Sequence, residues 1–308
     1  MGSKKGIEKK LVENANIPYT GIHTGKWRRY FDLKNLTDPF RIMLGFFEAW
    51  WVLGRLKPKV IFSKGGFVAL PVVLAGWCRR IPVLIHESDA IPGLTTRLSA
   101  PFARKILLAY ETAHMKLASY EKKIEMIGNP VRRSLLEGDP ERARRHYGFK
   151  DKKPLLLVMG GSSGSEELNK LVEKEKENWL AHFNVVHIAG KHHDEQRTKN
   201  YIRLPYVEKG MNDLYALSDL AITRAGANTL AELHTLQIPS LLYPLGRQSS
   251  RGDQMANAKI MSLESNLFCI AHTEKTALEQ LALLPPRPSH LNPNTSTEKI
   301  AWLLLSYA

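Results

Sequence analysis

The sequence has little of what marks secreted or membrane-spanning proteins. It contains two cysteines, Cys78 and Cys269, each in an apolar setting. That count excludes a disulfide framework and suits buried thiols in a reducing compartment. The longest uncharged run, residues 65–78, has fourteen residues and includes Pro71, whereas a membrane-spanning helix needs roughly 20 apolar residues. Residues 1–10 are polar and basic and lack the apolar stretch of a signal peptide. We therefore expect neither a membrane span nor a signal peptide.

Acidic residues are also scarce relative to basic ones. Lys and Arg number 44 against 30 Asp and Glu, which gives a net charge of +14. Such an excess attracts partners that carry phosphate, namely nucleic acid, anionic lipid or a sugar nucleotide, and the charge alone does not choose among them. The basic residues are scattered and form no recognised nucleic-acid-binding module, so we expect no nucleic acid among the partners.

What the sequence does contain is a repeated alternation of short apolar runs and helical patterns. Such runs are typical of buried parallel strands, and their alternation with helices predicts doubly wound α/β domains. The length of 308 residues suits two of them, at roughly 150 residues each. The runs occupy residues 59–63, 81–85, 154–159, 185–188, 219–223 and 239–243.

The domain boundary is predicted between Gly128 and Lys153, where a proline and an Arg-rich stretch interrupt the alternation. This gives an N-terminal Rossmann-like domain at 1–135, a second one at 150–285, and a C-terminal helix at 293–308 that could pack on either. Open parallel sheets bind ligands at the carboxyl ends of their strands. The two domains are therefore expected to bind ligands in a cleft that they face from both sides.

A glycine- and serine-rich turn follows the run at 154–159. Glycine lets the backbone approach a ligand, Ser162 and Ser163 supply hydroxyls, and a helix over 166–177 would present free N–H groups to an anion. A diphosphate fits such a turn. A tight strand-to-helix turn with serine caps explains the same residues equally well.

Two further segments of the second half place polar groups after a strand. Residues 221–232 run from a strand through small residues into a helix. Glu232 in that helix could accept hydrogen bonds from both hydroxyls of a ribose, although a lone helical glutamate is more often a solvated surface residue. Gln254, in the polar segment 245–257, could contact sugar hydroxyls, and an exposed loop is the alternative.

In the first half, His86, Glu87 and Asp89 come directly after the run at 81–85. Inverting sugar transfer needs a base that removes the proton of the acceptor hydroxyl, and either His86 or Glu87 could serve. Both could instead orient the loop by hydrogen bonding. Arg132 could bind a departing diphosphate in a bidentate manner that Lys cannot match.

Basic and aromatic residues gather between residues 26 and 55. Residues 40–55 have an apolar, tryptophan-rich helical pattern, and residues 26–30 are mostly basic. This combination suits a helix at an anionic bilayer surface, and an ordinary core helix is the alternative. We expect part burial and part membrane contact. The candidate membrane residues are Trp27, Arg28, Arg29, Phe46, Phe47, Trp50 and Trp51.

Six motifs follow one another along the chain: SKGGF at 63–67, HESDAIPGL at 86–94, GNPVR at 128–132, GGSSG at 160–164, AGANTLAE at 225–232 and SRGDQ at 250–254. Together they closely resemble the MurG family of peptidoglycan glycosyltransferases. That family transfers N-acetylglucosamine from UDP-N-acetylglucosamine to undecaprenyl-diphosphate-linked muramoyl pentapeptide, which converts lipid I to lipid II. The resemblance implies the GT-B fold, inversion at the anomeric carbon, and neither metal nor cofactor. It also implies a peripheral location at the cytoplasmic side of the bacterial cell membrane.

The resemblance also assigns roles by position. Arg132 and Ser162, with Ser163 beside it, would contact the donor diphosphate. Val207 would contact uracil through its backbone, and Gln254 would contact the sugar. Asp89, a further donor contact, stands where many relatives have Asn. The ribose and phosphate segment comprises Ala227, Asn228, Thr229, Leu230, Ala231 and Glu232.

One departure from the family concerns the start of the chain. The family opens with a strand, a glycine-rich turn that ends in a His, and a helix, whereas residues 1–8 resemble a later segment. The resemblance therefore predicts an incomplete N-terminal domain. Two alternatives stay open: a glycosyltransferase that builds glycolipid from diacylglycerol, and a non-catalytic UDP-sugar-binding or fragment form. The motifs at 86–94 and 128–132 favour the peptidoglycan enzyme over the first alternative.

Overall fold

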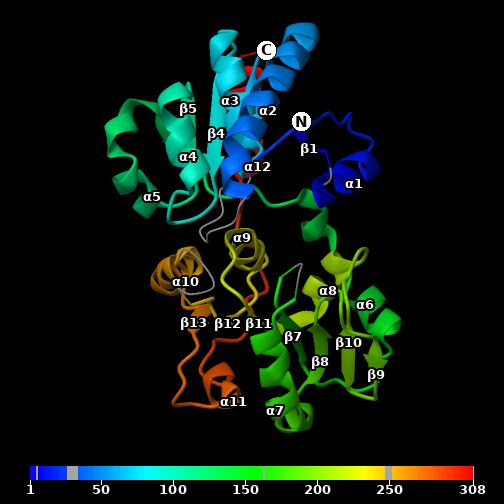
Figure 1. Ribbon diagram of the computed structural model, residues 1–308. Helices are drawn as coiled ribbons and strands as arrows, with labels where there is room; N and C mark the ends of the chain where they lie inside the picture. The colour runs from blue at the N-terminus through cyan, green and yellow to red at the C-terminus, as the bar shows by residue number, and fades with distance from the viewer. Residues whose placement is uncertain (5, 26–33, 162–163, 247–251, 308) are drawn as a thin grey trace. The chain divides into compact units, whose positions relative to one another are not determined.

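The computed structural model describes residues 1–4, 6–25, 34–161, 164–246 and 252–307. The chain divides after Gly128 into two compact units, each with its own parallel sheet (Figure 1). The first unit comprises residues 1–128 together with the C-terminal residues from 298, and the second comprises residues 129–297. The last helix therefore belongs to the first unit although its sequence follows the second.

A four-stranded parallel sheet in the order β3-β4-β5-β6 forms the centre of the first unit. Its strands are β3 (Ile61–Ser63), β4 (Val83–Glu87), β5 (Lys105–Leu108) and β6 (Ile124–Met126). A separate parallel pair consists of β1 (Gly2–Ser3) and β2 (Gly21–Ile22). The helices are α1 (Ile7–Asn14), α2 (Lys34–Leu56), α3 (Ala69–Cys78), α4 (Leu94–Ser99), α5 (Glu111–Lys116) and α12 (Ser296–Leu305), with three-ten turns η1 (Ala100–Phe102) and η2 (Ala118–Lys123).

Both faces of this sheet are covered, because successive residues of a strand point to opposite faces. Ile85 of β4 lies in a cluster with Leu53 of α2. Leu84, its neighbour in β4, lies in a second cluster with Ile300 and Leu303 of α12. Burial on both faces explains why the apolar run of β4 shows no alternation with polar residues.

The second unit is built on a seven-stranded sheet in the order β13-β12-β11-β7-β8-β10-β9, parallel except for β9. Its strands are β7 (Leu155–Met159), β8 (Asn184–Ile188), β9 (Gln196–Arg197), β10 (Tyr201–Leu204), β11 (Ser218–Thr223), β12 (Ser240–Leu242) and β13 (Phe268–Ile270). Its helices are α6 (Pro140–Tyr147), α7 (Glu166–His182), α8 (Met211–Leu217), α9 (Ala227–Thr235), α10 (Asp253–Glu264) and α11 (Ala277–Leu281), with the three-ten turn η3 (Arg133–Glu137).

The central strand β7 of this sheet is apolar throughout. Every residue of β7 is buried, and β7 pairs with β8 on one side and β11 on the other. Trp179 of α7, which is 0% exposed, packs with Leu156 and Val158 in the main core. Since β7, β8 and β11 are parallel, their carboxyl ends lie at one edge of the sheet, and the loops that follow them meet there.

Candidate functional site

A cavity of about 210 Å³ lies at the carboxyl ends of β7 and β8 in the second unit. Met159 and Ile188, the last residues of these strands, line it, together with Tyr215 of α8 and both Thr229 and Glu232 of α9. This is the position where open parallel sheets bind their ligands. The other lining residues are Arg132, Gly161, Tyr206, Val207, Glu208 and Met211.

Two side chains hold the carboxylate of Glu232 in this cavity. The hydroxyl of Tyr215 donates to Oε2 at 3.0 Å, and Nη2 of Arg132 lies 3.8 Å from Oε1. Burial raises the pKa of Glu232, while the hydrogen bond from Tyr215 and the charge of Arg132 oppose that rise. The Arg132 side chain is 70% exposed, so the ion pair adds little to stability. Its guanidinium is therefore accessible to an anionic ligand.

The other predicted residues of α9 differ in what they offer to a ligand. Ala227 and Leu230 are 6% and 0% exposed, so their side chains belong to the core. Only their backbone could meet a ligand. Thr229 lines the cavity, Asn228 is exposed, and Ala231 is half-buried. The structure thus brings Thr229 and Glu232 of this segment together at the site.

Among the remaining predicted donor contacts, Asp89 lies half-buried in the loop after β4 of the first unit, and the others belong to the second unit. Val207 lines the same cavity. Gln254, in the first turn of α10, accepts a hydrogen bond from the backbone N–H of Leu245 through Oε1 at 3.0 Å. Its amide therefore holds Leu245, which lies shortly after β12. Ser162 and Ser163 lie outside the residues that the structure describes.

The N-terminus of α7 is held by Arg224, a residue that the sequence pattern did not single out. Arg224 is 7% exposed. It donates to Ser165 Oγ at 3.0 Å, to Tyr243 O at 2.8 Å and to Glu167 Oε2 at 2.8 Å. Ser165 in turn caps α7 by accepting from the backbone N–H of Leu168. The available signal was one charged residue within an otherwise small and apolar segment.

His86, the first candidate base, is almost fully buried in the first unit. It is 1% exposed, and its Nε2 lies 2.9 Å from Gly128 O, so Nε2 carries the proton and donates it. Its Nδ1 has no hydrogen-bond partner among the residues that the structure describes. Burial lowers the pKa of His86 to about 4, and the charge of Lys64 acts in the same direction. The ring is therefore neutral at pH 7, with a lone pair on Nδ1.

Glu87, the second candidate base, is 6% exposed and engaged within its own loop. Its carboxylate accepts from the backbone N–H of Asp89 at 3.1 Å and of Gly93 at 2.8 Å, and from the Thr96 hydroxyl at 2.5 Å. A general base must reach the proton that it removes. These contacts are those of the loop-orienting interpretation of Glu87, and its role as a base stays a prediction.

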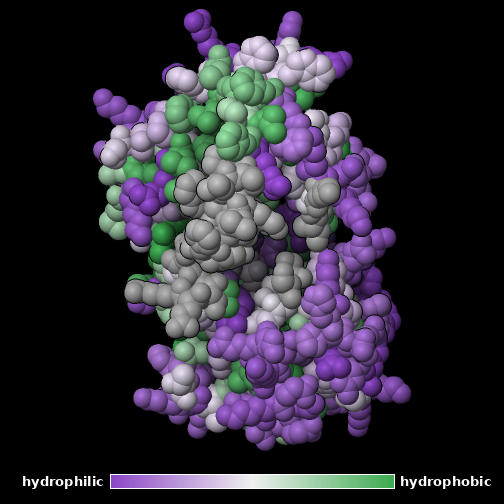
Figure 2. All heavy atoms as spheres, viewed as in Figure 1, coloured by the Kyte–Doolittle hydropathy of each residue, from purple (hydrophilic) through white to green (hydrophobic). Residues whose placement is uncertain are grey.

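The aromatic helix α2 is partly buried and partly exposed. Phe46 packs against the core, whereas Phe47, Trp50 and Trp51 are 58%, 44% and 57% exposed. Figure 2 shows apolar residues gathered over the first unit, while the drawn face of the second unit is mostly hydrophilic. Other exposed apolar residues of α2 are Phe40, Met43, Leu44 and Leu56.

Two arginines lie over the exposed tryptophan rings. The Arg79 guanidinium is 4.0 Å from the ring centroid of Trp50, and that of Arg55 is 4.7 Å from the centroid of Trp51. The predicted membrane residues Trp27, Arg28 and Arg29 lie outside the described part of the chain. Among the described residues, no helix is long and apolar enough to span a membrane, and no group of three His, Cys, Asp or Glu could hold a metal ion.

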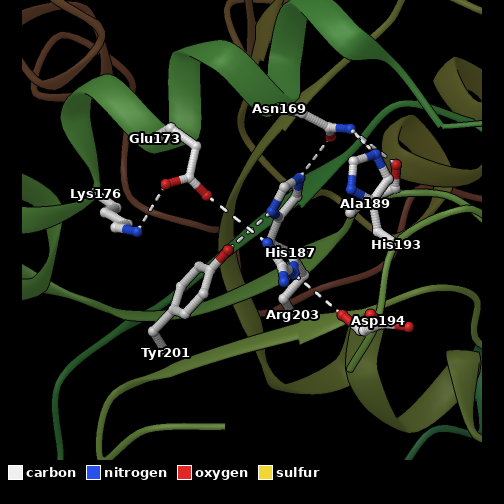
Figure 3. Close-up of polar contacts among 9 residues, drawn as sticks. All are labelled: Asn169, Glu173, Lys176, His187, Ala189, His193, Asp194, Tyr201 and Arg203. Atoms are coloured by element: carbon white, nitrogen blue, oxygen red, sulfur yellow. Dashed lines mark hydrogen bonds and ion pairs between the residues drawn. The ribbon is translucent and has the colours of Figure 1, made fainter. Parts of the chain in front are cut away.

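A second polar cluster joins α7 to β8 and β10 (Figure 3). His187 is 2% exposed, and burial lowers its pKa to about 4. Nε2 of the neutral ring lies 2.9 Å from Asn169 Oδ1, and Nδ1 lies 3.1 Å from the Tyr201 hydroxyl. Arg203 and Glu173 pair at 3.8 Å beside it. These groups satisfy one another, so the cluster fastens α7 to the sheet.

Two Rossmann-like units with parallel sheets define the GT-B class of fold, in which many nucleotide-sugar glycosyltransferases are built. Residues 1–108 match the glycosyltransferase family 28 N-terminal domain, and residues 155–286 match the glycosyltransferase family 28 C-terminal domain. The chain belongs to glycosyltransferase family 28, and within it to the MurG glycosyltransferases.

Several relatives and solved structures are similar to this chain. The UDP-N-acetylglucosamine--N-acetylmuramyl-(pentapeptide) pyrophosphoryl-undecaprenol N-acetylglucosamine transferase of Clostridium botulinum strain Loch Maree is 45% identical over 84% of this chain and 73% of its own length. A Bacillus anthracis transferase of the same description, numbered 2, is also 45% identical, over 84% and 74% of the two chains. The crystal structure of Acinetobacter baumannii MurG matches 99% of this chain and 89% of that chain, with a TM-score of 0.67 and 25% identity. The UDP-GlcNAc 2-epimerase of Methanocaldococcus jannaschii, at 15% identity and a TM-score of 0.66, shares the fold.

Proposed function

We propose that this chain transfers N-acetylglucosamine from UDP-N-acetylglucosamine to undecaprenyl-diphosphate-linked muramoyl pentapeptide, which forms lipid II from lipid I in peptidoglycan synthesis. The relatives that are 45% identical to it over 84% of the chain are described by that transfer. The observation that carries the proposal is the Glu232 carboxylate, held by Tyr215 in a cavity at the carboxyl ends of β7 and β8.

The uridine diphosphate part of the donor would occupy this cavity. The Glu232 carboxylate, an acceptor of hydrogen bonds only, suits the two hydroxyls of a ribose. The backbone of Val207 would meet the uracil. Arg132, whose guanidinium is mostly exposed, would bind the diphosphate and stabilise the charge that grows on it as UDP leaves.

For removal of the acceptor proton, His86 is our first candidate and Glu87 our second. The Nε2 proton of His86 is donated to Gly128 O, so the lone pair that would accept a proton is on Nδ1, which is buried in this structure. A pKa of about 4 makes a free imidazolium unfavourable at this position. The proton would therefore pass to Nδ1 as the bond to UDP breaks, when the acceptor hydroxyl has become acidic.

We further propose that the exposed face of α2 rests on an anionic membrane surface, which places the protein peripherally at the cytoplasmic face of the bacterial membrane. Aromatic side chains that bury their rings at the lipid interface, with cations beside them, give a helix affinity for anionic bilayers. Phe47, Trp50 and Trp51 supply the rings, and Arg55 and Arg79 supply the cations.

The test is transfer of labelled N-acetylglucosamine from its UDP donor to a soluble short-chain analogue of lipid I by the 308-residue chain. We expect labelled disaccharide product, and no product when diacylglycerol replaces the acceptor. Transfer to diacylglycerol would instead support the glycolipid-forming alternative. UDP binding without any transfer would support the non-catalytic alternative. A folded chain that neither binds UDP nor transfers sugar would overturn the proposal.

A further inference from the structure

Tyr215 does not belong to any motif of the sequence, yet it contacts the acidic group of the donor cavity. It lies in α8 and is 2% exposed. Its hydroxyl donates to Glu232 Oε2 at 3.0 Å, and the Sδ of Met159 lies 3.8 Å from the same oxygen. Because a hydroxyl has a single proton and a carboxylate is a far stronger acceptor than a thioether, that proton goes to Glu232.

This hydrogen bond determines which lone pairs of the carboxylate are left for a ligand. Tyr215 occupies one lone pair of Oε2, and Arg132 lies on the side of Oε1. Each carboxylate oxygen has two acceptor positions, so both oxygens still have one for a hydroxyl. Glu232 is half-buried, and it keeps the bond from Tyr215 only while Oε2 faces that hydroxyl. The bond therefore selects one orientation before the ligand arrives.

The backbone that carries Tyr215 is itself held against the backbone that carries Glu232. The guanidinium of the half-buried Arg287 donates to the carbonyls of Tyr215, Ala216 and Ser218, at 2.6 to 3.0 Å. It also donates at 3.0 Å to the carbonyl of Leu236, which follows α9. One side chain thus joins the C-terminal ends of α8 and α9, which fixes the distance that the bond from Tyr215 to Glu232 must span.

We propose that Tyr215 is a positioning residue that orients the Glu232 carboxylate toward the 2′- and 3′-hydroxyls of the nucleotide, and thereby makes the site selective for ribonucleotide over deoxyribonucleotide donors. The inference rests on the proposed function, since it assumes that the cavity binds the uridine part of a UDP-sugar. It concerns the donor site alone, so it can be tested by nucleotide binding without sugar transfer.

The first experiment compares UDP and 2′-deoxy-UDP binding by calorimetry in the wild-type chain and in Tyr215→Phe. A hydrogen bond to a charged group contributes enough to shift affinity by about tenfold. We expect Tyr215→Phe to bind UDP about tenfold more weakly, to bind 2′-deoxy-UDP almost as the wild type does, and so to lose most of the preference for UDP. An unchanged ratio of the two affinities would overturn the proposal.

The matched control is Tyr201→Phe. Tyr201 is also 2% exposed and also gives its hydroxyl to a buried partner, His187, but it lies in the cluster of Figure 3. A general loss of packing would affect both variants, whereas the loss of nucleotide selectivity is expected for Tyr215→Phe alone. An equal loss of selectivity in Tyr201→Phe would assign the effect to packing and overturn the proposal.

Two further readouts separate positioning from a structural role. In steady-state transfer, Tyr215→Phe should raise KM for the donor about tenfold and leave kcat within about twofold. Adding Tyr215→Phe to Glu232→Gln should weaken UDP binding by less than about twofold, because the group that Tyr215 orients has lost its charge. If Tyr215→Phe does not fold, the wild-type and Glu232→Gln chains still test the idea. Glu232→Gln must then lose the preference for UDP, and retention of that preference would overturn the proposal.

The pH dependence gives an independent check. The bond from Tyr215 lowers the pKa of Glu232 against the effect of burial, so its loss should move that pKa upward. As the solution is acidified, UDP binding by Tyr215→Phe should therefore begin to weaken at a higher pH than UDP binding by the wild type. Failure of UDP to bind the wild-type chain at all would instead refute the proposed function.

Discussion

The guanidinium of Arg224 donates to the hydroxyl of Ser165 across 3.0 Å and so joins the loop after β11 to the N-terminus of α7. Arg224 also donates to Tyr243 O and to Glu167. Its contacts therefore reach segments that follow three different strands, β7, β11 and β12. A single buried side chain thus holds together the edge of the sheet at which the donor cavity opens.

Replacing Arg224 by Met should lower the free energy of unfolding by about 2 kcal/mol, because Ser165 Oγ and the Tyr243 carbonyl would lose their donor in a buried place. Urea unfolding followed by circular dichroism measures this. Arg145→Met is the control, since Arg145 is exposed, and it should change stability by less than about 0.5 kcal/mol. Equal effects of the two substitutions would show that the contacts of Arg224 add no stability.

Gly164 should tolerate alanine far less well than Gly148. Both have positive φ, +78° and +75°, so alanine is strained at either position, at about 1–2 kcal/mol. A Cβ on Gly164 would also lie 2.3 Å from Ala189 O, whereas one on Gly148 would meet nothing within 4 Å. We expect Gly164→Ala to be the less stable variant and to bind UDP more weakly, by displacement of the turn after β7. Thermal unfolding and calorimetry measure both effects, and equal stability of the two variants would contradict the steric argument.

The two buried histidines should make the protein acid-sensitive. The pKa of His86 and that of His187 each fall from 6.5 to about 4 because burial disfavours the charged ring. A depressed pKa means that the unfolded chain takes up protons first, so stability is present above pH 6.5 and is lost as pH falls toward 4. Each histidine should contribute about 3 kcal/mol to this loss. Unfolding of the wild type, His86→Gln and His187→Gln at pH 7, 5.5 and 4.5 should show a shallower decline in each variant. An equal loss of stability with falling pH in the wild type and both variants would contradict this prediction.

Membrane binding should depend on the exposed rings of α2. The double variant Trp50→Ser/Trp51→Ser removes two large apolar side chains, so we expect its binding to anionic phospholipid vesicles to fall at least tenfold. Cosedimentation with vesicles of phosphatidylglycerol and phosphatidylcholine measures this. Leu11→Ser is the control, because Leu11 of α1 is 59% exposed and lies outside α2. Undiminished binding by the double variant would exclude α2 as the membrane-binding surface.

The sequence predicted the α/β class and the central strands because those strands are continuous apolar runs. It did not predict β1, β2, β5, β6, β9, β10 or β13, which are two to four residues long. The strands β3 and β12 are equally short, but they lie within longer apolar runs, at 59–63 and 239–243, that carry the pattern. The helix expected over 166–177 continues to His182. Its buried positions Leu168, Val172 and Trp179 extend one helical face through the whole segment. That signal was present in the sequence.

Within the site, local motifs predicted the residues that face the cavity but not those that hold them. Glu232, Thr229, Val207 and Arg132 line a single cavity although they come from three segments. Tyr215 was missed because a tyrosine in an apolar helix resembles an ordinary core residue, and its partner lies 17 positions away. A contact between residues far apart in the sequence cannot be predicted from the spacing of residues within one motif.

The helix α12 has a consequence for how the protein forms during synthesis. Leu84 and the neighbouring strands of the first sheet have one face covered by Ile300 and Leu303, which are translated more than two hundred residues later. While the ribosome makes the second unit, that face of the nascent sheet stays open to water and to other chains, since domains generally fold as they emerge. A chaperone that binds apolar surface would therefore be of most use to this protein between the completion of β6 and the release of α12.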